Sequence, residues 1–486
     1  MSYLRRYFPP FTLVLAVICF YLYGLGSVGV LDPDEPRYLA IGHAMAQTRD
    51  LLIPKLWGTP WFEKPPLIYW MTALGAAVGL GPEVSGRLPV ALLSLAFLAL
   101  MFIMLRREFG TEPAAISSAL LATCAGWLAF SSLALTDLPL SVFYSLAVFI
   151  ALRVIGSPLE VPHTRSLFLM GICLGFATLA KGLVPIALAA PFLWFLRRRW
   201  RSWWIALVAI AIVALPWYLV MCQRFGAAFL NDFFWKHHFE RLYSSSLQHV
   251  QPWWYYVPVL LGALFPWTPL LIPLALRGRR PWDERRFFLV CCVAWGFLLF
   301  SISLNKLPGY LLPLLPALFA LFGASIDWRR LADSIRWWLM PSALLISLLP
   351  LVARALPQAI AAGRLTVPHG FNPGPTTFFY MGAPIAATLL ARRAWTGILL
   401  VLCLIAGLFF VKIVTFPVLD RTISARGLFH EVQHIPGSVC SNWMNRDLEY
   451  GFDFYRGAAY PPCGDGKFDY ALESRGRTLR IVRRSK

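Results

Sequence analysis

The sequence predicts an all-α protein that crosses a membrane many times and ends in a small polar domain. Of its 486 residues, 58% are hydrophobic and 14% are charged, and the mean hydropathy is +0.62. A soluble domain of this size would lack the polar residues needed to cover its surface. Apolar runs of about 18 to 22 residues recur along the chain, and this is the length that an α-helix needs to cross a bilayer.

The distribution of charge predicts the orientation of these spans. The net charge of +20 arises from 44 Lys and Arg against 24 Asp and Glu. The arginines gather in short segments between apolar runs, which is the cytoplasmic pattern of the positive-inside rule and not that of a nucleic-acid-binding surface. These segments are Arg5-Arg6, Arg106-Arg107, Arg197 to Arg199, Arg277 to Arg286, Arg329-Arg330 and Arg392-Arg393.

About thirteen spans fit this distribution when they alternate in direction. The first follows Arg5-Arg6 and lacks a small-residue cleavage site, so we expect a retained helix and not a removed signal peptide. With this start, every arginine cluster falls on one side of the membrane. The expected spans are 11–28, 88–105, 114–133, 139–155, 167–180, 183–196, 203–222, 254–276, 287–303, 311–326, 337–353, 376–391 and 395–416.

The opposite side is predicted to receive the long loop 29–87 and the end of the chain. We therefore expect a transmembrane domain at 1–416, with loop 29–87 on its periplasmic side, and a small periplasmic α/β domain at 417–486. Cys440 and Cys463 lie in this polar end. In an oxidising compartment they would form a disulfide that closes a loop of about 24 residues, and two separate thiols are the alternative.

The first outer loop contains two charged motifs. One is "LDPDEPRY", which includes Asp34 and Arg37, and the other is "WFEKPPLIYW", which includes Glu63 and Lys64. The segment between them has an amphipathic period, so we expect a helix along the membrane surface with Asp34 and Glu35 in its first turn. Acids at that position complement the helix dipole, so helix capping alone is an alternative explanation for both carboxylates.

Other outer turns add further ionisable or phenolic side chains. For Asp137, a helix cap is the simpler alternative. For Lys181, the simpler alternative is a lysine whose ammonium group reaches the membrane interface. Ionisable groups at membrane depth are costly unless they are paired or line a wet cavity, so the turns together predict one polar cavity at the outer edge of the bilayer. The side chains are Asp137, Lys181, Lys306 and Tyr310, and His238 and His249 in loop 223–253.

Such a cavity suits the transfer of a sugar from a lipid-borne phosphate ester. Lys and Arg meet the charge that develops on a leaving phosphate. A carboxylate stabilises an oxocarbenium-like state or takes a proton from an attacking hydroxyl. Glu63 and a histidine of loop 223–253 are a weak signal for a divalent metal, because the two ligands are scattered in sequence.

Taken in order, the motifs resemble the GT-C glycosyltransferases that use lipid-linked sugars. The resemblance is closer to the bacterial branch that contains the lipid A aminoarabinose transferase and relatives of the protein O-mannosyltransferases. It rests on "PDEPRY…FEKPPLIYW", "TDLP", "AKG", "HHFERL…QHVQPWWYYVP" and "NKLPGYLLPLLP", over most of residues 25–325. It implies an inverting inner-membrane enzyme with a GT-C type fold and a periplasm-facing site. The implied donor is a polyprenyl-phosphate-linked sugar, such as aminoarabinose on undecaprenyl phosphate, and the implied acceptor is lipid A or another envelope molecule.

The resemblance also implies roles for individual residues. Asp34 and Asp137 are the expected catalytic carboxylates. A divalent metal (Zn, Mg or Mn) would be held by Glu63 and by His238 or, as second choice, His249. The positions expected to hold the donor phosphate or the substrate are Arg37, Lys64, Lys181, Lys306 and Tyr310.

Three departures leave the sugar and the acceptor open. Pro36 stands where the lipid A transferase usually has Thr, and "FEKPPLIYW" replaces "FEKPIAGYW". The C-terminal domain also looks shorter. A protein O-mannosyltransferase-like enzyme is one alternative. A lipid-linked-sugar flippase or transporter is another, although it would place charges near the bilayer midplane in related halves. An O-antigen ligase or polymerase would bring large arginine-rich outer loops, which the sequence lacks, and a purely structural protein would not gather acids and lysines at six turns.

Overall fold

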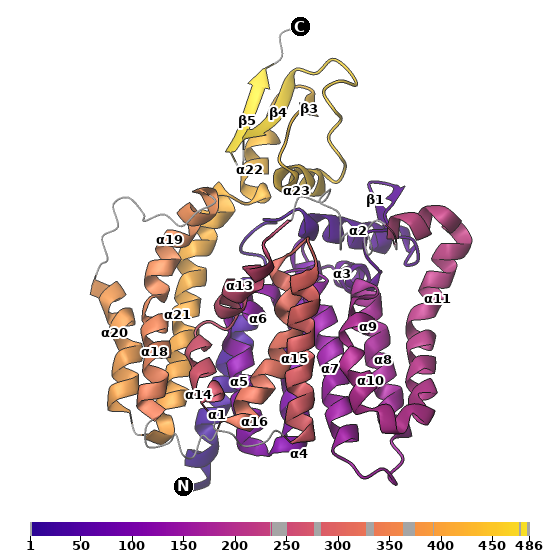
Figure 1. The fold of residues 1–486 in the computed structure, drawn as a ribbon. Helices are drawn as coiled ribbons and strands as arrows, with labels where there is room; N and C mark the ends of the chain where they lie inside the picture. The colour runs from indigo at the N-terminus through magenta and orange to yellow at the C-terminus, as the bar shows by residue number, and fades with distance from the viewer. Residues whose placement is uncertain are drawn as a thin grey trace. The chain divides into compact units, whose positions relative to one another are not determined.

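The computed structural model describes the chain apart from residues 1, 234, 236–249, 277–282, 327–334, 363–374, 392, 476–477 and 484–486. The chain forms two compact units, and both are mainly helical (Figure 1). The first unit contains Met1–Pro60, Tyr69–Pro89 and Ala343–Lys486, and the second contains Trp61–Ile68 and Val90–Ser342.

Long helices from both ends of the chain pack together in the first unit. Helix α21 contacts α1, α19 and α20. Lys412 of α21 donates hydrogen bonds to the carbonyls of Phe20 and Tyr23 at the end of α1. The ends of the chain are thus joined within one unit. The bounds are α1 Ser2–Leu22, α19 Leu349–Ala362, α20 Pro375–Leu390 and α21 Arg393–Thr422.

The amphipathic helix predicted after the first span is confirmed as α2 (Asp34–Thr48), which runs crosswise to α1 and α21 (Figure 1). Its apolar face packs on α3 (Leu67–Ala77), where the rings of Tyr38 and Tyr69 meet edge to face. Gly42 permits this close approach, because a Cβ there would lie 2.5 Å from Thr72. Between the two helices, β1 (Lys55–Leu56) and β2 (Thr59–Pro60) form a short antiparallel hairpin.

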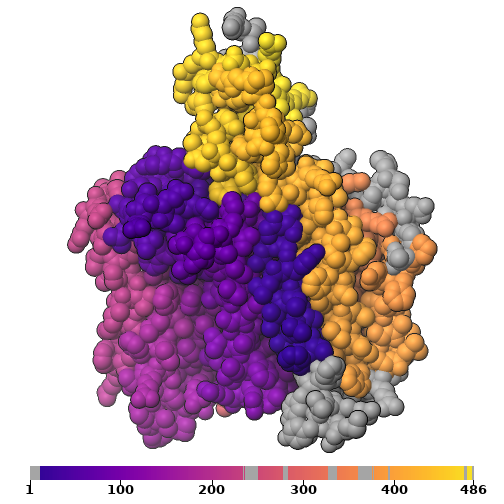
Figure 2. Space-filling model, turned by 180° about the vertical axis from the view of Figure 1, so that it is seen from behind, coloured from indigo at the N-terminus to yellow at the C-terminus, as the bar shows by residue number. Residues whose placement is uncertain are grey.

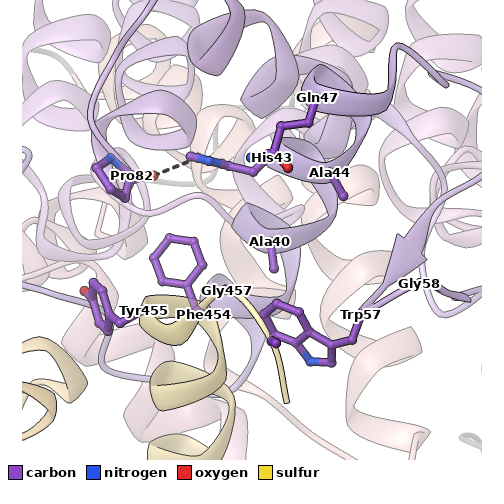
Figure 3. A pocket seen from close by; sticks show the side chains of 11 residues that line it. Ala40, His43, Ala44, Gln47, Trp57, Gly58, Pro82, Phe454, Tyr455 and Gly457 are labelled. Atoms are coloured by element: carbon purple, nitrogen blue, oxygen red, sulfur yellow. Dashed lines mark hydrogen bonds between the residues drawn. The ribbon is translucent and has the colours of Figure 1, made fainter. Parts of the chain in front are cut away.

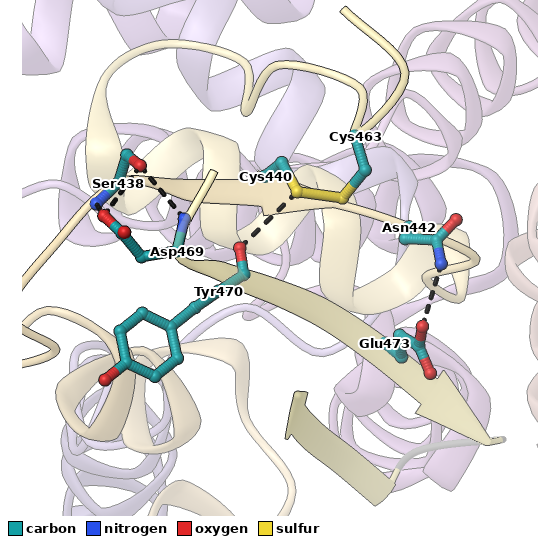
Figure 4. Close-up of a disulfide and its surroundings, with 7 residues drawn as sticks. All are labelled: Ser438, Cys440, Asn442, Cys463, Asp469, Tyr470 and Glu473. Atoms are coloured by element: carbon teal, nitrogen blue, oxygen red, sulfur yellow. Dashed lines mark hydrogen bonds between the residues drawn. A yellow bond between two sulfur atoms is a disulfide. The ribbon is translucent and has the colours of Figure 1, made fainter. Parts of the chain in front are cut away.

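The end of the chain forms the predicted small α/β domain. Its sheet has the order β3-β4-β5, with β3 parallel to β4 and β4 antiparallel to β5. The disulfide Cys440–Cys463 ties β3 to the segment that follows α23 (Figure 4). The predicted boundary at 417 falls inside α21, which continues to Thr422. The bounds are α22 Ala425–Val432, β3 Val439–Ser441, α23 Arg446–Arg456, β4 Tyr470–Arg475 and β5 Thr478–Arg483.

The second unit is a bundle in which α8 packs between α7 and α11. Gly171 and Gly175 of α8 lie against α11, because small residues let two helices approach closely in a membrane bundle. α4 starts in the first unit and α18 ends in it. The bounds are α4 Val84–Phe109, α5 Thr111–Thr123, α6 Ala125–Phe130, α7 Asp137–Ile155, α8 Thr164–Lys181, α9 Val184–Leu188, α10 Ala190–Phe195, η1 Arg197–Ser202, α11 Trp203–Phe229, η3 Trp253–Tyr255, α13 Tyr256–Ala263, η4 Thr268–Leu270, α14 Leu271–Ala275, α15 Glu284–Ile302, η5 Pro308–Leu314, α16 Leu315–Ser325 and α18 Ile335–Ser347.

The helices make the chain a multi-pass membrane protein, as the composition predicted. Among the described residues, seven helices are long and apolar enough to cross a membrane, or up to nine if each of two bent pairs is one span. The remaining predicted spans coincide with shorter or interrupted helices: the apolar part of α1 (Phe11–Leu22), α5 with α6, α9 with α10, and α20.

Candidate active site

The start of α2 is capped by Asp32. Its Oδ1 accepts hydrogen bonds from the backbone N–H groups of Asp34 (2.7 Å) and Glu35 (2.9 Å). These are amides that the first turn of a helix leaves without an intrahelical partner. Asp32 therefore does the capping that the sequence offered as the simpler explanation for Asp34 and Glu35, and both of those carboxylates make other contacts.

Glu35 belongs to a buried ion pair. Arg87 of α4 donates from Nε to Oε1 (2.8 Å) and from Nη2 to Oε2 (2.7 Å). The same guanidinium donates to the carbonyls of Leu25 (2.9 Å) and Val28 (2.6 Å). This bidentate pair fixes the loop that leads into α2, so Glu35 has a structural role.

Asp34 is the accessible carboxylate of the motif. Its side chain is 34% exposed, whereas that of its partner Arg37 is 4% exposed. Arg37 also donates from Nε to the carbonyl of Pro33 (2.8 Å), and its guanidinium lies 4.9 Å from the ring of Tyr450 in α23. The structure thus gives Asp34 a fixed cationic neighbour and an open side.

The carboxyl of Asp32 has a shifted pKa. Burial is the main cause, and the negative charges of Glu35 and Asp34 act in the same direction. The two backbone hydrogen bonds oppose these effects, and the result is a pKa of about 7 in place of 3.8. The charge next to Asp34 therefore changes near neutral pH.

The loop before α2 is fastened to the C-terminal domain. The hydroxyl of Tyr455 donates to Glu83 (2.7 Å) and accepts from the N–H of Val30 (3.1 Å). Asp420 accepts from the N–H of Gly29 (2.7 Å), and Arg426 bridges Asp420 and Glu83. Figure 2 shows the C-terminal residues in yellow next to the indigo N-terminal residues. The C-terminal domain therefore helps to position the segment that carries Asp34.

A second cluster lies in the second unit, where the structure brings together three of the predicted residues. Asp137 is the first residue of α7 and Lys181 the last residue of α8, and Lys181 Nζ lies 2.6 Å from Asp137 Oδ1. The same ammonium group lies 4.5 Å from the centre of the Tyr310 ring. The side chains of Asp137 and Lys181 are only 14% and 10% exposed, so both are held as a largely buried pair.

Two glycines shape this cluster. Gly182 has φ +65 and ends α8 directly after Lys181, as glycines often end helices. Gly309 faces the aspartate, because a Cβ there would lie 2.7 Å from Asp137 Oδ1 and 2.8 Å from the ring of Phe130. A side chain at Gly309 would therefore crowd Asp137, and one at Gly182 would strain the backbone next to Lys181.

The other predicted residues have different surroundings. Glu63 and Lys64 form a buried pair with 3.0 Å between Nζ and Oε1. Lys306 is buried and donates to the carbonyls of Gln251 (3.1 Å) and Ser303. It thereby holds the turn between α15 and η5.

The predicted metal histidines cannot be placed beside Glu63. His238 and His249 lie outside the described residues. The described part of the chain contains no group of three or more His, Cys, Asp or Glu side chains that could hold a metal ion. The single carboxylate of Glu63, already bonded to Lys64, is the one predicted ligand that the structure describes.

The comparisons with known proteins agree with the predicted resemblance. Residues 63–221 match the family model described as dolichyl-phosphate-mannose-protein mannosyltransferase. The undecaprenyl phosphate-alpha-4-amino-4-deoxy-L-arabinose arabinosyl transferase of Pseudomonas aeruginosa strain UCBPP-PA14 is 34% identical over 339 residues, which are 66% of this chain and 60% of that protein. The match thus spans about 60% of the length of that relative.

Two solved structures share the fold. The crystal structure of ArnT from Cupriavidus metallidurans bound to undecaprenyl phosphate has a TM-score of 0.77 at 22% identity, and covers 95% of this chain and 92% of that one. The archaeal oligosaccharyltransferase AglB from Archaeoglobus fulgidus has a TM-score of 0.53 at 11% identity, and covers 94% and 64%. The predicted GT-C fold and the resemblance to this family of lipid-linked-sugar glycosyltransferases are confirmed.

Proposed function

We propose that the chain is an inverting glycosyltransferase of the bacterial inner membrane that moves aminoarabinose from undecaprenyl phosphate to lipid A. The observation that carries this proposal is the accessible carboxylate of Asp34, fixed next to the buried Arg37 at the start of a capped helix. A relative that matches 66% of this chain is named as a transferase of that sugar from that carrier, which supports the proposal.

The role of Asp34 follows from the acceptor. A phosphate acceptor is already an anion, so it needs no general base, and Asp34 would stabilise the positive charge that develops on the sugar ring. Arg37 is held by the Pro33 carbonyl and lies near the Tyr450 ring, so it orients Asp34 without leaving its place.

The donor phosphate is expected to approach Lys181. Charge that develops on a leaving phosphate is stabilised by a cation that is already in place. Asp137 and the ring of Tyr310 hold the ammonium group of Lys181, which supports this assignment. Lys64 is paired with Glu63, and Lys306 donates to backbone carbonyls. We therefore expect both lysines to stabilise the local structure and not to bind the phosphate directly.

The disulfide supports a periplasmic site. Disulfides persist in the bacterial periplasm and are rare in the cytosol. Cys440 and Cys463 lie in the domain that hydrogen-bonds the loop before Asp34. We therefore expect the C-terminal domain and Asp34 to lie on the same, oxidising side of the membrane.

A divalent metal at Glu63 remains a prediction from the resemblance. One carboxylate, shared with Lys64, is a weak site by itself, and its second ligand would have to be His238 or His249. Treatment of the purified chain with EDTA tests this: a metal-dependent transferase loses activity and regains it with Zn²⁺, Mg²⁺ or Mn²⁺, whereas an unchanged rate removes the metal from the account.

Mass spectrometry of lipid A and other envelope glycans, from cells with and without the chain, tests the proposed function. Loss of an aminoarabinose mass from lipid A supports it. Unchanged lipid A contradicts the assignment of lipid A as the acceptor.

A protein O-mannosyltransferase-like activity is the second candidate, because the family model that matches residues 63–221 has that description. It predicts a sugar missing from an envelope protein in the same experiment. If no sugar is missing and the lipid-linked donor accumulates in the cytoplasmic leaflet, the chain is a flippase instead.

A further inference from the structure

A cavity of about 440 Å³ lies in the first unit, away from the start of α2. Figure 3 shows Ala40, His43 and Gln47 along α2, with Phe454 of α23 and Trp57 of the β1–β2 hairpin across from them. Positions three and four residues apart share one face of a helix, so α2 presents small and polar side chains to the cavity. Its volume lies within the range of small-ligand sites, about 300–1,000 Å³.

The lining excludes most charged ligands. The described residues that line the cavity include no Lys, Arg, Asp or Glu. His43 is held through Nε2 by the hydroxyl of Ser85 (2.8 Å), and burial lowers the pKa of its imidazole below 6.5. The cavity therefore combines the aromatic rings of Trp57, Phe454 and Tyr455 with an amide and an uncharged imidazole. This lining suits a neutral ligand that has both apolar faces and hydroxyl groups.

Trp57 is the unusual residue of this cavity. The hairpin turn consists of Trp57 (φ +51) and Gly58 (φ +85), where both positions favour Asn-Gly or a similar pair. A bulky side chain with a positive φ is strained, and such strain is concentrated at functional sites. The indole Nε1 is also buried and has no hydrogen-bond partner among the described residues. A ligand that stacks on the ring and accepts from Nε1 would account for both features.

We propose that this cavity binds the neutral saccharide part of the acceptor glycolipid, an inference that rests on the proposed function. α2 carries both Asp34 and the cavity, and His43 and Gln47 follow Asp34 by roughly 14 and 20 Å along the helix. Nine residues also place His43 half a turn around α2 from Asp34, so an acceptor whose reacting end lies at Asp34 would pass around the helix to bring its sugar rings into the cavity. The occupant is a glycolipid headgroup of at least two rings.

The test compares two tryptophans that both have a positive φ. Trp57→Asn removes the ring and places a favoured residue in the turn, so we expect an unchanged or higher Tm together with weaker saccharide binding. Trp443→Asn is the matched control, because Trp443 also has a positive φ (+53), lies in the same unit and is 85% exposed outside the cavity. Trp57→Phe keeps a stacking face and should restore part of the affinity.

Binding of a neutral β-1,6-linked N-acetylglucosamine disaccharide to the purified full-length chain is followed by saturation-transfer NMR. We expect binding to the wild type and to the inactive Asp34→Asn variant, at least tenfold weaker binding to Trp57→Asn, and no change in Trp443→Asn. In transfer assays, Trp57→Asn should raise KM for lipid A about tenfold and leave kcat and the donor KM within twofold.

The outcomes separate this inference from the proposed function. No binding to the wild type, or equal binding to Trp57→Asn, overturns the saccharide cavity. Disaccharide binding that depends on Trp57, without any transfer to lipid A by the wild type, supports the cavity and contradicts the acceptor of the proposed function.

Discussion

Three carboxylates within four residues have three different environments at the start of α2. Asp32 accepts backbone hydrogen bonds, Glu35 is buried against Arg87, and Asp34 is partly open. At this helix start, Asp32 therefore caps the helix, Glu35 stabilises the preceding loop, and Asp34 is left for the chemistry. This division leads to distinct expectations for conservative substitutions at the three positions.

Asp34→Asn should abolish most of the transfer and leave the fold intact. The amide keeps the volume of the side chain but removes the charge that stabilises the transition state, so we expect a loss of about 100-fold or more in kcat. Transfer is measured by mass spectrometry with the purified chain. Asp50→Asn is the control, because Asp50 pairs with Lys55 beyond the end of α2; full activity of Asp34→Asn would refute the assignment.

Glu35→Gln should act on stability. It leaves the buried Arg87 without its charged partner, and breaking a buried ion pair costs about 3–5 kcal/mol. We expect a lower Tm and less folded protein in the membrane, measured by thermal unfolding in detergent. A variant with wild-type Tm and reduced kcat would instead place Glu35 in the chemistry.

Asp32→Asn should change how stability depends on pH. The folded-state pKa of about 7 is above the unfolded value of 3.8, so the folded chain binds more protons between these values and loses stability as pH rises through them. Asn keeps the capping oxygen and does not ionise. The Tm of the variant should therefore fall less than that of the wild type between about pH 5 and about pH 8, a range that spans the titration of the carboxyl. Parallel curves would contradict the shifted pKa.

At the scale of elements, hydropathy predicted where the helices lie and missed where they break. Residues 254–276 are continuously apolar, yet the helices Trp253–Ala263 and Thr268–Ala275 meet at 109°. Pro266 lies between them and has no N–H to continue a helix. Such a break depends on packing, so apolar content alone did not reveal it.

The site was predictable to the extent that its partners are close in sequence. Asp34 and Arg37 are one helical turn apart, so a single short sequence motif contains both. Asp137 and Lys181 pair only because α7 and α8 pack side by side. The contact of Tyr450 with Arg37 has no sequence signal, because it comes from a domain whose placement no motif indicates.

Gly309→Ala should disrupt the Asp137–Lys181 pair. The new Cβ would lie 2.7 Å from the aspartate oxygen, and such overpacking costs about 1–3 kcal/mol. We expect a lower rate of transfer and a raised donor KM in steady-state assays. Gly262→Ala in α13 is the matched control, because nothing lies within 4 Å of its Cβ position; equal effects at both glycines would contradict the role of the pair.

At the scale of the whole molecule, the disulfide links stability with orientation. Replacing Cys440 and Cys463 by Ser should destabilise the C-terminal domain by about 2–4 kcal/mol, because the bond joins two cysteines that are 23 positions apart and closes the loop between them.

In intact cells, a membrane-impermeant thiol reagent should label the two cysteines after reduction and not before. Labelling only after the inner membrane is opened would place this domain, and Asp34 with it, on the cytoplasmic side.

Transfer by the purified chain, in vesicles that contain lipid A and undecaprenyl-phosphate-linked aminoarabinose, tests the catalytic role of Asp34 most directly. We expect lipid A to gain the mass of one sugar, and Asp34→Asn to stop this gain while the variant remains folded. If the donor only moves between leaflets, or if lipid A gains the sugar equally well with Asp34→Asn, the assignment of a glycosyltransferase with Asp34 at its centre is wrong.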